Sequence, residues 1–377
     1  MVDETVQQKD DEAPDRESAG AGSRLVRPET GVAILLAIAL GLFAYLAGGK
    51  GLFSGQGVMR WLVSSAEYSL VAVPACLLIT SRQFDLSAGA LIGFSGIIVA
   101  SLSVSLGYPV WFALLAAMGG AVLIGLLNGV LTALSGVPSV IVTLGTLFAL
   151  RGLAALIATG TSGSVVITGV RDVASEDPIA AVFGGEMFQS VFNWLAAQGW
   201  IGAYEVGHRA GQPIVTGLPM IIVWAVILAV IAIFLLRWTR SLDQEQASVE
   251  QVQELDPTYV ASGWDFSRAP LHLFMFSAFC AAIFAACQVT ALGSAATDRG
   301  QFMAFEGIAA AIIGGAAVAG GAGTVPGAVL AALLLGLIRE GVLYAGGQSA
   351  LYYVIIGFLL LPALLINRLL RRAAQNQ

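Results

Sequence analysis

The stretch "SRQFDLSAGALIGFSG", Ser81–Gly96, decides how the rest of the chain is interpreted. It joins an apolar run over 62–81 to a second apolar run over 86–106, and Arg82 and Asp85 are the charged residues at the junction. A carboxylate directly before an apolar run can accept hydrogen bonds from the free backbone amides of a helix's first turn. The stretch therefore predicts a helix start between two membrane-spanning helices.

Other residues of this stretch support the same interpretation. Ser87 can help to satisfy the amides of the first turn, and Gly89 lets a neighbouring helix approach closely. Arg82 favours a cytoplasmic position for the junction. We expect Asp85 to be architectural, at the cytoplasmic end of the bundle, rather than a ligand for a transported molecule.

The composition is that of a polytopic membrane protein. Of 377 residues, 57% are hydrophobic and 11% are charged, whereas a soluble domain carries about 25% charged residues. The 45 glycines, many of them inside the apolar runs, indicate close helix packing, because lipid gives helices no hydrophobic drive to associate.

Ten apolar runs are candidates for membrane-spanning helices, since about 20 residues cross the hydrocarbon layer. They cover 31–49, 62–81, 86–106, 109–134, 139–159, 216–236, 271–292, 304–320, 325–345 and 350–368. We therefore predict an all-α fold, a polytopic membrane helical bundle of about ten transmembrane helices. An even number places both termini on the same side of the membrane.

Basic residues near the span ends predict the orientation of the bundle. Nine arginines lie on the side of the termini, namely Arg24, Arg27, Arg82, Arg237, Arg240, Arg268, Arg368, Arg371 and Arg372. Five basic residues lie on the other side, namely Lys50, Arg60, Arg171, Arg209 and Arg299. Because cytoplasmic flanks are richer in Lys and Arg, we predict that both termini are cytoplasmic.

The segments outside the runs complete the predicted organisation. Residues 1–30 are acidic and lack aliphatic periodicity, which predicts a disordered cytoplasmic tail. A transmembrane domain covers 31–370, with an extracytoplasmic segment over 160–215 and a cytoplasmic loop over 237–270. Residues 371–377 form a second cytoplasmic tail.

Each long loop contains one amphipathic stretch. In the outer segment, four apolar residues share a helical face and predict an interfacial helix: Phe188, Val191, Phe192 and Leu195. In the cytoplasmic loop, Ser248 and Gln251 have capping-box spacing, and Pro257 would end the helix. We expect a short helix that lies across the cytoplasmic surface.

The sequence lacks the motifs of common enzymes. It has no phosphate-binding loop, no HExxH pattern and no paired-carboxylate arrangement. Gly93–Gly96 reads G-x-S-G, but a nucleophile needs a base, and the two histidines fall in the outer loop (His208) and at the cytoplasmic edge of a span (His272), so we interpret Ser95 as a packing residue. The three cysteines show neither disulfide nor zinc spacing. We expect no catalytic residues, no metal site and no cofactor bound by this chain.

Six charged residues are expected at membrane depth, where each is costly. They are Glu67, Asp85, Arg151, Glu306, Arg339 and Glu340. Arg339 and Glu340 lie near the outer end of their span, where snorkelling or local pairing suffices. Arg151 lies in mid-span, where it either lines a polar cavity or forms a structural ion pair with Glu67 or Glu306. The sequence leaves both readings of Arg151 open.

Three stretches resemble one family of transporters. "FDLSAGALIGFSGIIVASL" is similar to the I-D-L-S-x-G segment of permease subunits of ribose-type sugar ATP-binding-cassette (ABC) importers, in the branched-chain amino acid and ribose permease superfamily. "LLNGVLTALSGVPSVIVTLGTLFALRGLA", Leu126–Ala154, resembles its L-N-G…V-T-L-G-T…R-G segment. "FEGIAAAIIGGAAVAGGAGTVPGAVLAALLLGLI", Phe305–Ile338, resembles its glycine-rich segment.

The resemblance assigns candidate site residues. Matching motif positions are Asp85, Leu86, Ser87, Gly89, Asn128, Gly129, Thr143, Leu144, Gly145, Thr146, Arg151, Gly152, Glu306, Gly314, Gly315, Gly320, Gly321 and Gly323. Among these we place Asn128, Thr143 and Thr146 near the translocation path, since neutral hydrogen-bonding groups suit polyols better than fixed charges do. Arg151 joins them as a candidate in the reading in which it lines a polar cavity. The other positions are expected to be structural.

The resemblance also implies partners and a location. These are two cytoplasmic ATPase subunits (or one fused double ATPase) that use ATP, a second permease subunit, an extracytoplasmic sugar-binding protein and the lipid bilayer of a bacterial plasma (inner) membrane. No nucleic-acid partner is expected. The predicted cytoplasmic helix would dock the ATPase through Val249, Glu250, Val252, Glu254 and Leu255.

This chain departs from the family pattern in the predicted docking loop, where the Gly-Gly-Asn and Ala-Ala elements are missing. The resemblance implies import of a monosaccharide or related polyol. The alternatives are a branched-chain amino acid permease of the same superfamily and a stand-alone proton-coupled carrier. The sequence does not identify the sugar or distinguish a homodimer from a heterodimer.

Overall fold

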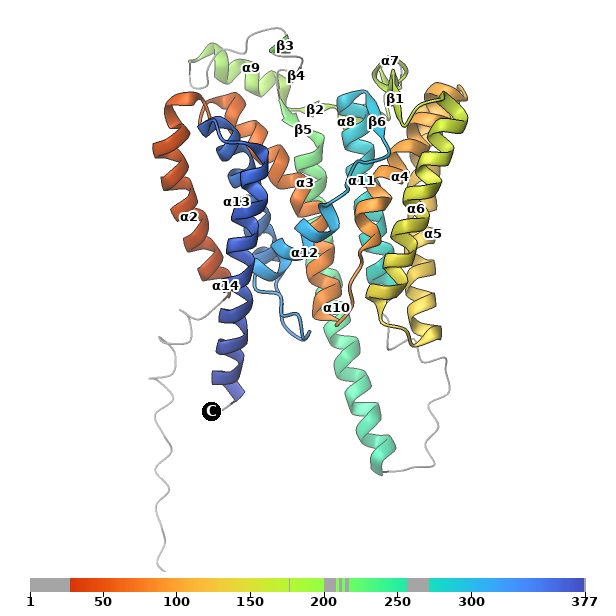
Figure 1. The fold of residues 1–377 in the computed structure, drawn as a ribbon, viewed down its shortest axis with the longest axis vertical. Helices are drawn as coiled ribbons and strands as arrows, with labels where there is room; N and C mark the ends of the chain where they lie inside the picture. Colours follow the sequence, from red (N-terminus) through yellow and green to blue (C-terminus); the bar gives the residue numbers. More distant parts are fainter. Residues whose placement is uncertain are drawn as a thin grey trace, which may run out of the picture.

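The computed structural model describes most of the chain, and it is almost entirely helical (Figure 1). The described residues are 28–175, 177–199, 208–209, 212–213, 217–255 and 271–375. The predicted acidic tail, apart from residues 28–30, lies outside them. Residues 28–30 already belong to the first described helix, α2.

The elements follow one another in a regular order. The helices are α2 (Pro28–Ala47), η1 (Gly48–Lys50), α3 (Gly55–Thr80), α4 (Ser87–Ala100), η2 (Ser101–Ser105), α5 (Val110–Ser135), α6 (Ser139–Ser162), α7 (Val170–Ala174), α8 (Ala181–Gly184), α9 (Gln189–Ala197), α10 (Met220–Leu255), α11 (Leu271–Leu292), α12 (Met303–Ile313), α13 (Val325–Ala345) and α14 (Ser349–Gln375). The strands are β1 (Val166–Thr168), β2 (Glu186–Met187), β3 (His208–Arg209), β4 (Gln212–Pro213), β5 (Leu218–Pro219) and β6 (Ser294–Ala296).

The polytopic helical bundle predicted from composition is confirmed. Eight helices in the described part of the chain are long and apolar enough to span a membrane: α2, α3, α4 with η2, α5, α6, the first part of α10, α11 and α13. The apolar part of α14, Ser349–Leu365, is slightly shorter. These nine elements match nine of the ten predicted runs.

The prediction of a full span over 304–320 is wrong. Only Met303–Ile313 is helical there, and the chain then turns through a glycine-rich loop to the start of α13. A helix of 11 residues is about 16 Å long, which is about half the thickness of the hydrocarbon core of a bilayer. The irregular segment 297–302 descends from β6 to α12 and completes this crossing (Figure 1).

The start of α2 and the end of α14 lie on the same side of the bundle (Figure 1), as the predicted even number of crossings requires. We call this side cytoplasmic, following the distribution of basic residues. The strands β2 to β5 and helix α9 lie at the opposite, outer side. The outer helix predicted around Val191 and Phe192 corresponds to α9, which is therefore confirmed as a helix.

Two halves of the bundle repeat the same arrangement in opposite directions. In the first half, α3 descends, an irregular segment follows, and the chain continues through the short α4, the long α5 and α6. In the second half, α11 ascends, an irregular segment follows, and the chain continues through the short α12, the long α13 and α14. The halves interlock, because α3 packs on α12 and α13 whereas α11 packs on α4 and α5.

Turn chemistry explains the boundary between α5 and α6. Gly136 has φ +66°, a left-handed conformation that glycine adopts without strain, and it ends α5. Pro138 then precedes the first residue of α6, where a missing amide proton costs nothing. The sequence "SGVPS" therefore makes a tight cytoplasmic hairpin, and this hairpin places the polar faces of α5 and α6 against the start of α4.

The cytoplasmic loop differs from the prediction. α10 is one continuous helix of 36 residues that ends at Leu255 and extends below the bundle (Figure 1). The predicted separate helix with Ser248 at its start is therefore wrong, since Ser248 lies inside α10. The docking candidates Val249 to Leu255 lie in this extension. The rest of the predicted loop, 256–270, lies outside the described residues.

Candidate functional site: two polar centres inside the bundle

The start of α4 lies deeper than the sequence indicated. Phe84 N donates to Ser139 Oγ at 2.9 Å and Leu86 N donates to Thr143 Oγ1 at 3.1 Å, so the extended residues before α4 run along the first turns of α6. Ser87 then meets Asn128, which lies about two turns before the end of α5. Asp85 is therefore about 10 Å inside the bundle, not at its cytoplasmic end.

Asp85 is the centre of a buried hydrogen-bonded network. Its Oδ1 accepts from the Ser87 amide at 2.9 Å and from Ser87 Oγ at 2.6 Å, as expected for a carboxylate at a helix start. Its Oδ2 accepts from Ser277 Oγ of α11 at 2.7 Å. Only 7% of Asp85 is exposed. The carboxylate thus joins the first turn of α4 to α11.

The same network extends into α5 and α6. Asn128 Nδ2 donates to Ser87 Oγ at 2.9 Å, and Thr146 Oγ1 donates to Asn128 Oδ1 at 2.6 Å. We call Asp85, Ser87, Asn128, Thr146 and Ser277 the Asp85 network. It joins four helices through consecutive bonds from hydroxyl, amide and carboxylate groups, and such fully paired buried networks rigidify a core.

This geometry bears on the predicted path residues. The structure brings together Asn128 and Thr146 directly, and Thr143 lies beside them at the Leu86 amide. Asn128 and Thr143 are completely buried. Since their polar groups already bond other parts of the chain, the arrangement favours a structural role for them over contact with a passing molecule.

Arg151 lies further along α6 and holds an irregular segment. Its Nη1 donates to the carbonyl oxygen of Thr297 at 2.6 Å and to that of Arg299 at 3.0 Å. Neither of the acidic partners proposed from the sequence, Glu67 and Glu306, accepts these bonds. The guanidinium instead satisfies backbone carbonyls of the segment 297–302, which lacks a helix's internal bonds at this depth.

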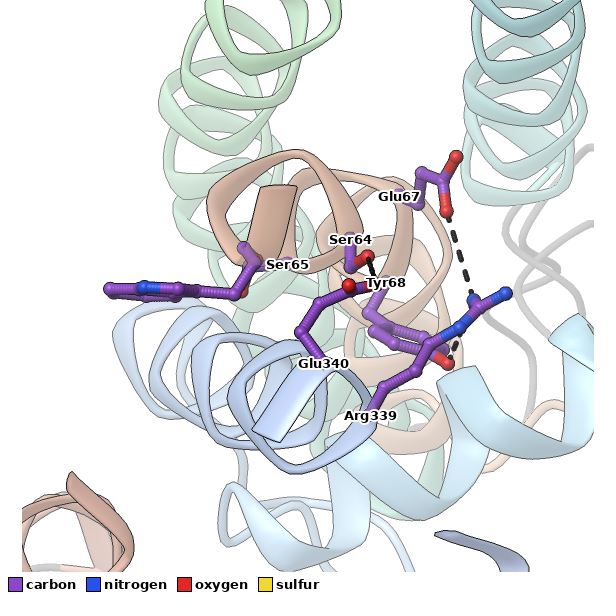
Figure 2. Close-up of polar contacts among 7 residues, drawn as sticks. Ser64, Ser65, Glu67, Tyr68, Arg339 and Glu340 are labelled. Atoms are coloured by element: carbon purple, nitrogen blue, oxygen red, sulfur yellow. Dashed lines mark hydrogen bonds and ion pairs between the residues drawn. The ribbon is translucent and has the colours of Figure 1, made fainter. Parts of the chain in front are cut away.

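A second polar centre, the Arg339 cluster, lies between α3 and α13 (Figure 2). Arg339 Nη1 is 3.8 Å from Glu67 Oε2 and donates to the Tyr68 hydroxyl at 3.1 Å. Beside this pair, Ser64 Oγ donates to Glu340 Oε1 at 2.9 Å. The cluster consists of Ser64, Glu67, Tyr68, Arg339 and Glu340. Arg339 is about a turn and a half from the outer end of α13, so the cluster lies in the outer half of the bundle.

The Arg339 cluster is partly open. The side chain of Arg339 is 40% exposed and that of Glu67 is 17% exposed. Glu306 of α12 is only 7% exposed and interacts electrostatically with Arg339 and Glu67. The motif glutamate carried over from the family thus belongs to the surroundings of this cluster.

The motif glycines fall into two groups. At Gly89 a Cβ would lie 2.5 Å from the Gly300 carbonyl oxygen, so the start of α4 touches the segment 297–302 through bare backbone. Gly314 contacts the backbone of Gly327 in the same way. Gly129 and Gly323 instead leave room for the side chains of Leu271 and Thr80. Gly315, Gly320 and Gly321 have positive φ in the loop after α12. Gly145 and Gly152, by contrast, face open space on α6, and nothing in the structure explains them.

Sequence reasoning missed two contributors to these centres. Ser277 stands alone as a hydroxyl in the apolar run "LHLFMFSAFC", and its isolation is the only signal. Tyr68 follows Glu67 directly, and its ring lies 5.8 Å below the Arg339 guanidinium carbon and 6.0 Å from the ring of Tyr352. An aromatic residue beside a membrane-depth carboxylate is a signal that could have been used.

Comparisons with known proteins agree with this architecture. The family model "Branched-chain amino acid transport system / permease component" matches residues 57–364. No solved structure matches the chain.

Three curated proteins illustrate the relationship. The xylose transport system permease protein of Escherichia coli K12 is 25% identical, covering 90% of this chain and 91% of that protein. The fructose import permease protein of Rhizobium meliloti is 24% identical, and the match covers 90% of this chain and 85% of that protein. The autoinducer 2 import system permease protein of Salmonella paratyphi B is 26% identical, covering 80% of each.

The family match covers most of the chain and includes both polar centres. It confirms the resemblance seen in the three sequence motifs, and it accounts for a bundle that crosses the membrane many times. The chain therefore belongs to the family of branched-chain amino acid transport system permease components, and it is a multi-pass membrane permease subunit of the ABC importer type.

Proposed function

We propose that this permease forms the translocation path for a monosaccharide or related polyol. The observation that carries the proposal is the similarity along about 90% of the chain to permeases named for xylose and fructose. The amino acid alternative rests on the family description alone. A permease named for autoinducer 2 is also among the relatives, so small polar molecules other than common sugars belong in any test.

The proposal includes the partners of an ABC importer. A cytoplasmic ATPase pair would supply ATP hydrolysis, a second permease subunit would complete the path, and an extracytoplasmic binding protein would deliver the substrate. The extension of α10 below the bundle supports an ATPase contact, because it is a long helix on the cytoplasmic side. On the outer side, α9 and its neighbouring strands offer a surface to a soluble protein.

Uptake measurements test the substrate class. The chain would be produced together with an ABC ATPase and an extracytoplasmic binding protein that co-purify with it, and uptake of labelled pentoses, hexoses, autoinducer 2 and leucine would be compared. We expect ATP-dependent uptake of a sugar or polyol. Uptake of leucine alone would support the amino acid alternative, and uptake without an ATPase would support a stand-alone carrier.

A pair of substitutions tests the ATPase contact. Glu250→Lys combined with Glu254→Lys reverses two charges in the α10 extension. We expect loss of ATPase co-purification while the chain remains folded in the membrane. Glu186→Lys on the outer strand β2 is a matched control, since it changes the same charge on the opposite side. Unchanged co-purification of the double variant would remove the α10 extension from the docking site.

A further inference from the structure

The segment 297–302 is unusual for a chain at membrane depth. It is irregular, it descends from β6 to α12 (Figure 1), and Asp298, Arg299 and Gln301 are exposed on it. Irregular backbone inside a membrane is tolerated only where protein buries it or water fills the space beside it. Exposed charges are likewise unfavourable against lipid. The exposed side of this segment therefore does not face lipid.

The Arg339 cluster continues this polar surface. Arg339 and Glu67 are partly exposed. A row of aromatic rings links them to the segment: Phe302 packs on Tyr353, Tyr353 on Tyr352, and Tyr352 on Tyr68, whose hydroxyl accepts from Arg339. The descending segment and the Arg339–Glu67 pair thus belong to one face, contributed by the segment, α3 and α13. This face begins at the outer side and leads to the middle of the bundle.

Aromatic rings border the same face. Phe302, the last residue of the segment, and Tyr353 of α14 are each 51% exposed. Their rings pack edge to face with centroids 5.8 Å apart. Tyr353 also lies within electrostatic reach of Arg339. A few polar groups beside aromatic surface is the usual composition of a small-molecule site.

We propose that this face is the outer wall of the translocation path, and that Arg339 and Glu67 contact the substrate there. The inference rests on the proposed function. A sugar hydroxyl both donates and accepts hydrogen bonds, so a guanidinium that only donates and a carboxylate that only accepts can bind adjacent hydroxyls. The Asp85 network has the same kinds of groups, but they are bonded to each other, and all of them are buried except the half-buried Thr146.

Cysteine labelling in intact cells tests the wall without any knowledge of the substrate. Gln301→Cys would be treated from outside with a charged, membrane-impermeant thiosulfonate. The unmodified chain gives the background, because Cys76, Cys280 and Cys287 are buried. Val226→Cys is the matched control, since Val226 is 60% exposed on the apolar surface of α10.

We expect Gln301→Cys to react about tenfold faster than Val226→Cys, because the nucleophile that attacks the thiosulfonate sulfur and expels sulfinate is the thiolate, which forms only in contact with water. Equal, slow labelling of both variants in an importer that still takes up sugar would overturn the wall and leave the proposed function intact. Fast labelling in an importer that takes up no sugar or polyol would support a water-filled wall and overturn the proposed function.

A second measurement tests substrate contact. Arg339→Lys keeps the charge but loses the planar fork of donors. We expect the KM for sugar uptake to rise about tenfold with little change in the maximal rate, because a contact to bound substrate is weakened. Arg237→Lys is the matched control, since it makes the same change at an exposed arginine toward the cytoplasmic side of α10. An unchanged KM in Arg339→Lys, or an equal rise in both variants, would remove Arg339 from the substrate site.

Discussion

The Asp85 network and the Arg339 cluster occupy corresponding places in the two inverted halves of the bundle, yet they are built differently. In each half, a long helix follows the short helix that begins after the irregular segment. This long helix contributes a polar side chain within two turns of its end, Asn128 in α5 and Arg339 in α13. The first centre is buried and joined by short hydrogen bonds. The second is partly exposed and contains a looser ion pair. One arrangement can thus serve as a structural joint in one half and as an open polar surface in the other.

The largest effect is expected at the centre of the buried network. Asp85→Ala removes the acceptor of the Ser87 amide, the Ser87 hydroxyl and the Ser277 hydroxyl. Leaving buried donors unpaired costs about 1–3 kcal/mol each, so we expect a loss of about 4 kcal/mol in the free energy of unfolding. Thermal unfolding of the detergent-solubilised chain measures it. Asp85→Asn keeps one acceptor oxygen and serves as the milder control; equal melting temperatures for Asp85→Ala and the parent would refute a structural joint.

Arg151 connects the two regions, because it belongs to α6 but holds the segment that leads to the Arg339 cluster. Arg151→Gln should cost about 2 kcal/mol, the usual value of hydrogen bonds from a charged donor. We also expect faster amide hydrogen exchange in the segment 297–302. Gly152→Ala, at a neighbouring position with open space, is the control. Unchanged exchange in Arg151→Gln would show that the segment does not depend on the guanidinium.

The contact between Gly89 and Gly300 joins the two halves directly. Gly89→Ala places a methyl group against the Gly300 carbonyl oxygen, and overpacking of this kind costs about 1–3 kcal/mol. We expect a destabilisation of about 1.5 kcal/mol in thermal unfolding. Gly145→Ala adds the same methyl group in open space and should be neutral or slightly stabilising. If Gly145→Ala were destabilised as much as Gly89→Ala, the loss of stability would not come from the contact between Gly89 and Gly300.

The smallest effect on stability is expected in the Arg339 cluster. Glu67→Gln should change the free energy of unfolding by about 0.5 kcal/mol, because the ion pair is long and partly exposed. A double-mutant cycle of Glu67→Gln with Arg339→Gln measures the coupling between the two side chains. A coupling as large as the effect of Asp85→Ala would abolish the contrast between the two centres.

The sequence predicted the regular parts of the fold well. Long apolar runs and basic flanks depend on the partition of whole segments between lipid and water, so nine of the ten runs correspond to apolar helices. The run 304–320 failed because apolarity does not reveal backbone conformation. Gly315 adopts positive φ just after α12 ends at Ile313, and Gly320 and Gly321 do so in the loop that follows, so the chain turns without adding polarity. The interruption of the chain at mid-membrane was therefore invisible to hydropathy.

The candidate site was predicted only in part. Asp85 and Ser87 were expected at a helix start, and their hydrogen bonds agree with that expectation. The hydrogen-bond acceptors of Arg151 are backbone carbonyls, which carry no sequence signature, so local pattern could not decide between the polar cavity and the ion pair that the sequence left open. The predicted helix start at Ser248 was wrong because capping-box spacing also fits the interior of a long helix, here α10. Contacts between distant elements, not local patterns, determine these features.

The small ribbon at the outer side has a mechanical consequence. β1 follows α6 and pairs antiparallel with β6, which leads into the segment 297–302. Thr297 N also donates to the Val165 carbonyl at 3.1 Å, while Arg151 holds the Thr297 carbonyl from lower on α6. α6 and the segment 297–302 are thus joined at two different depths. A tilt of α6 would therefore move the segment 297–302 as well, because the two are joined at both points.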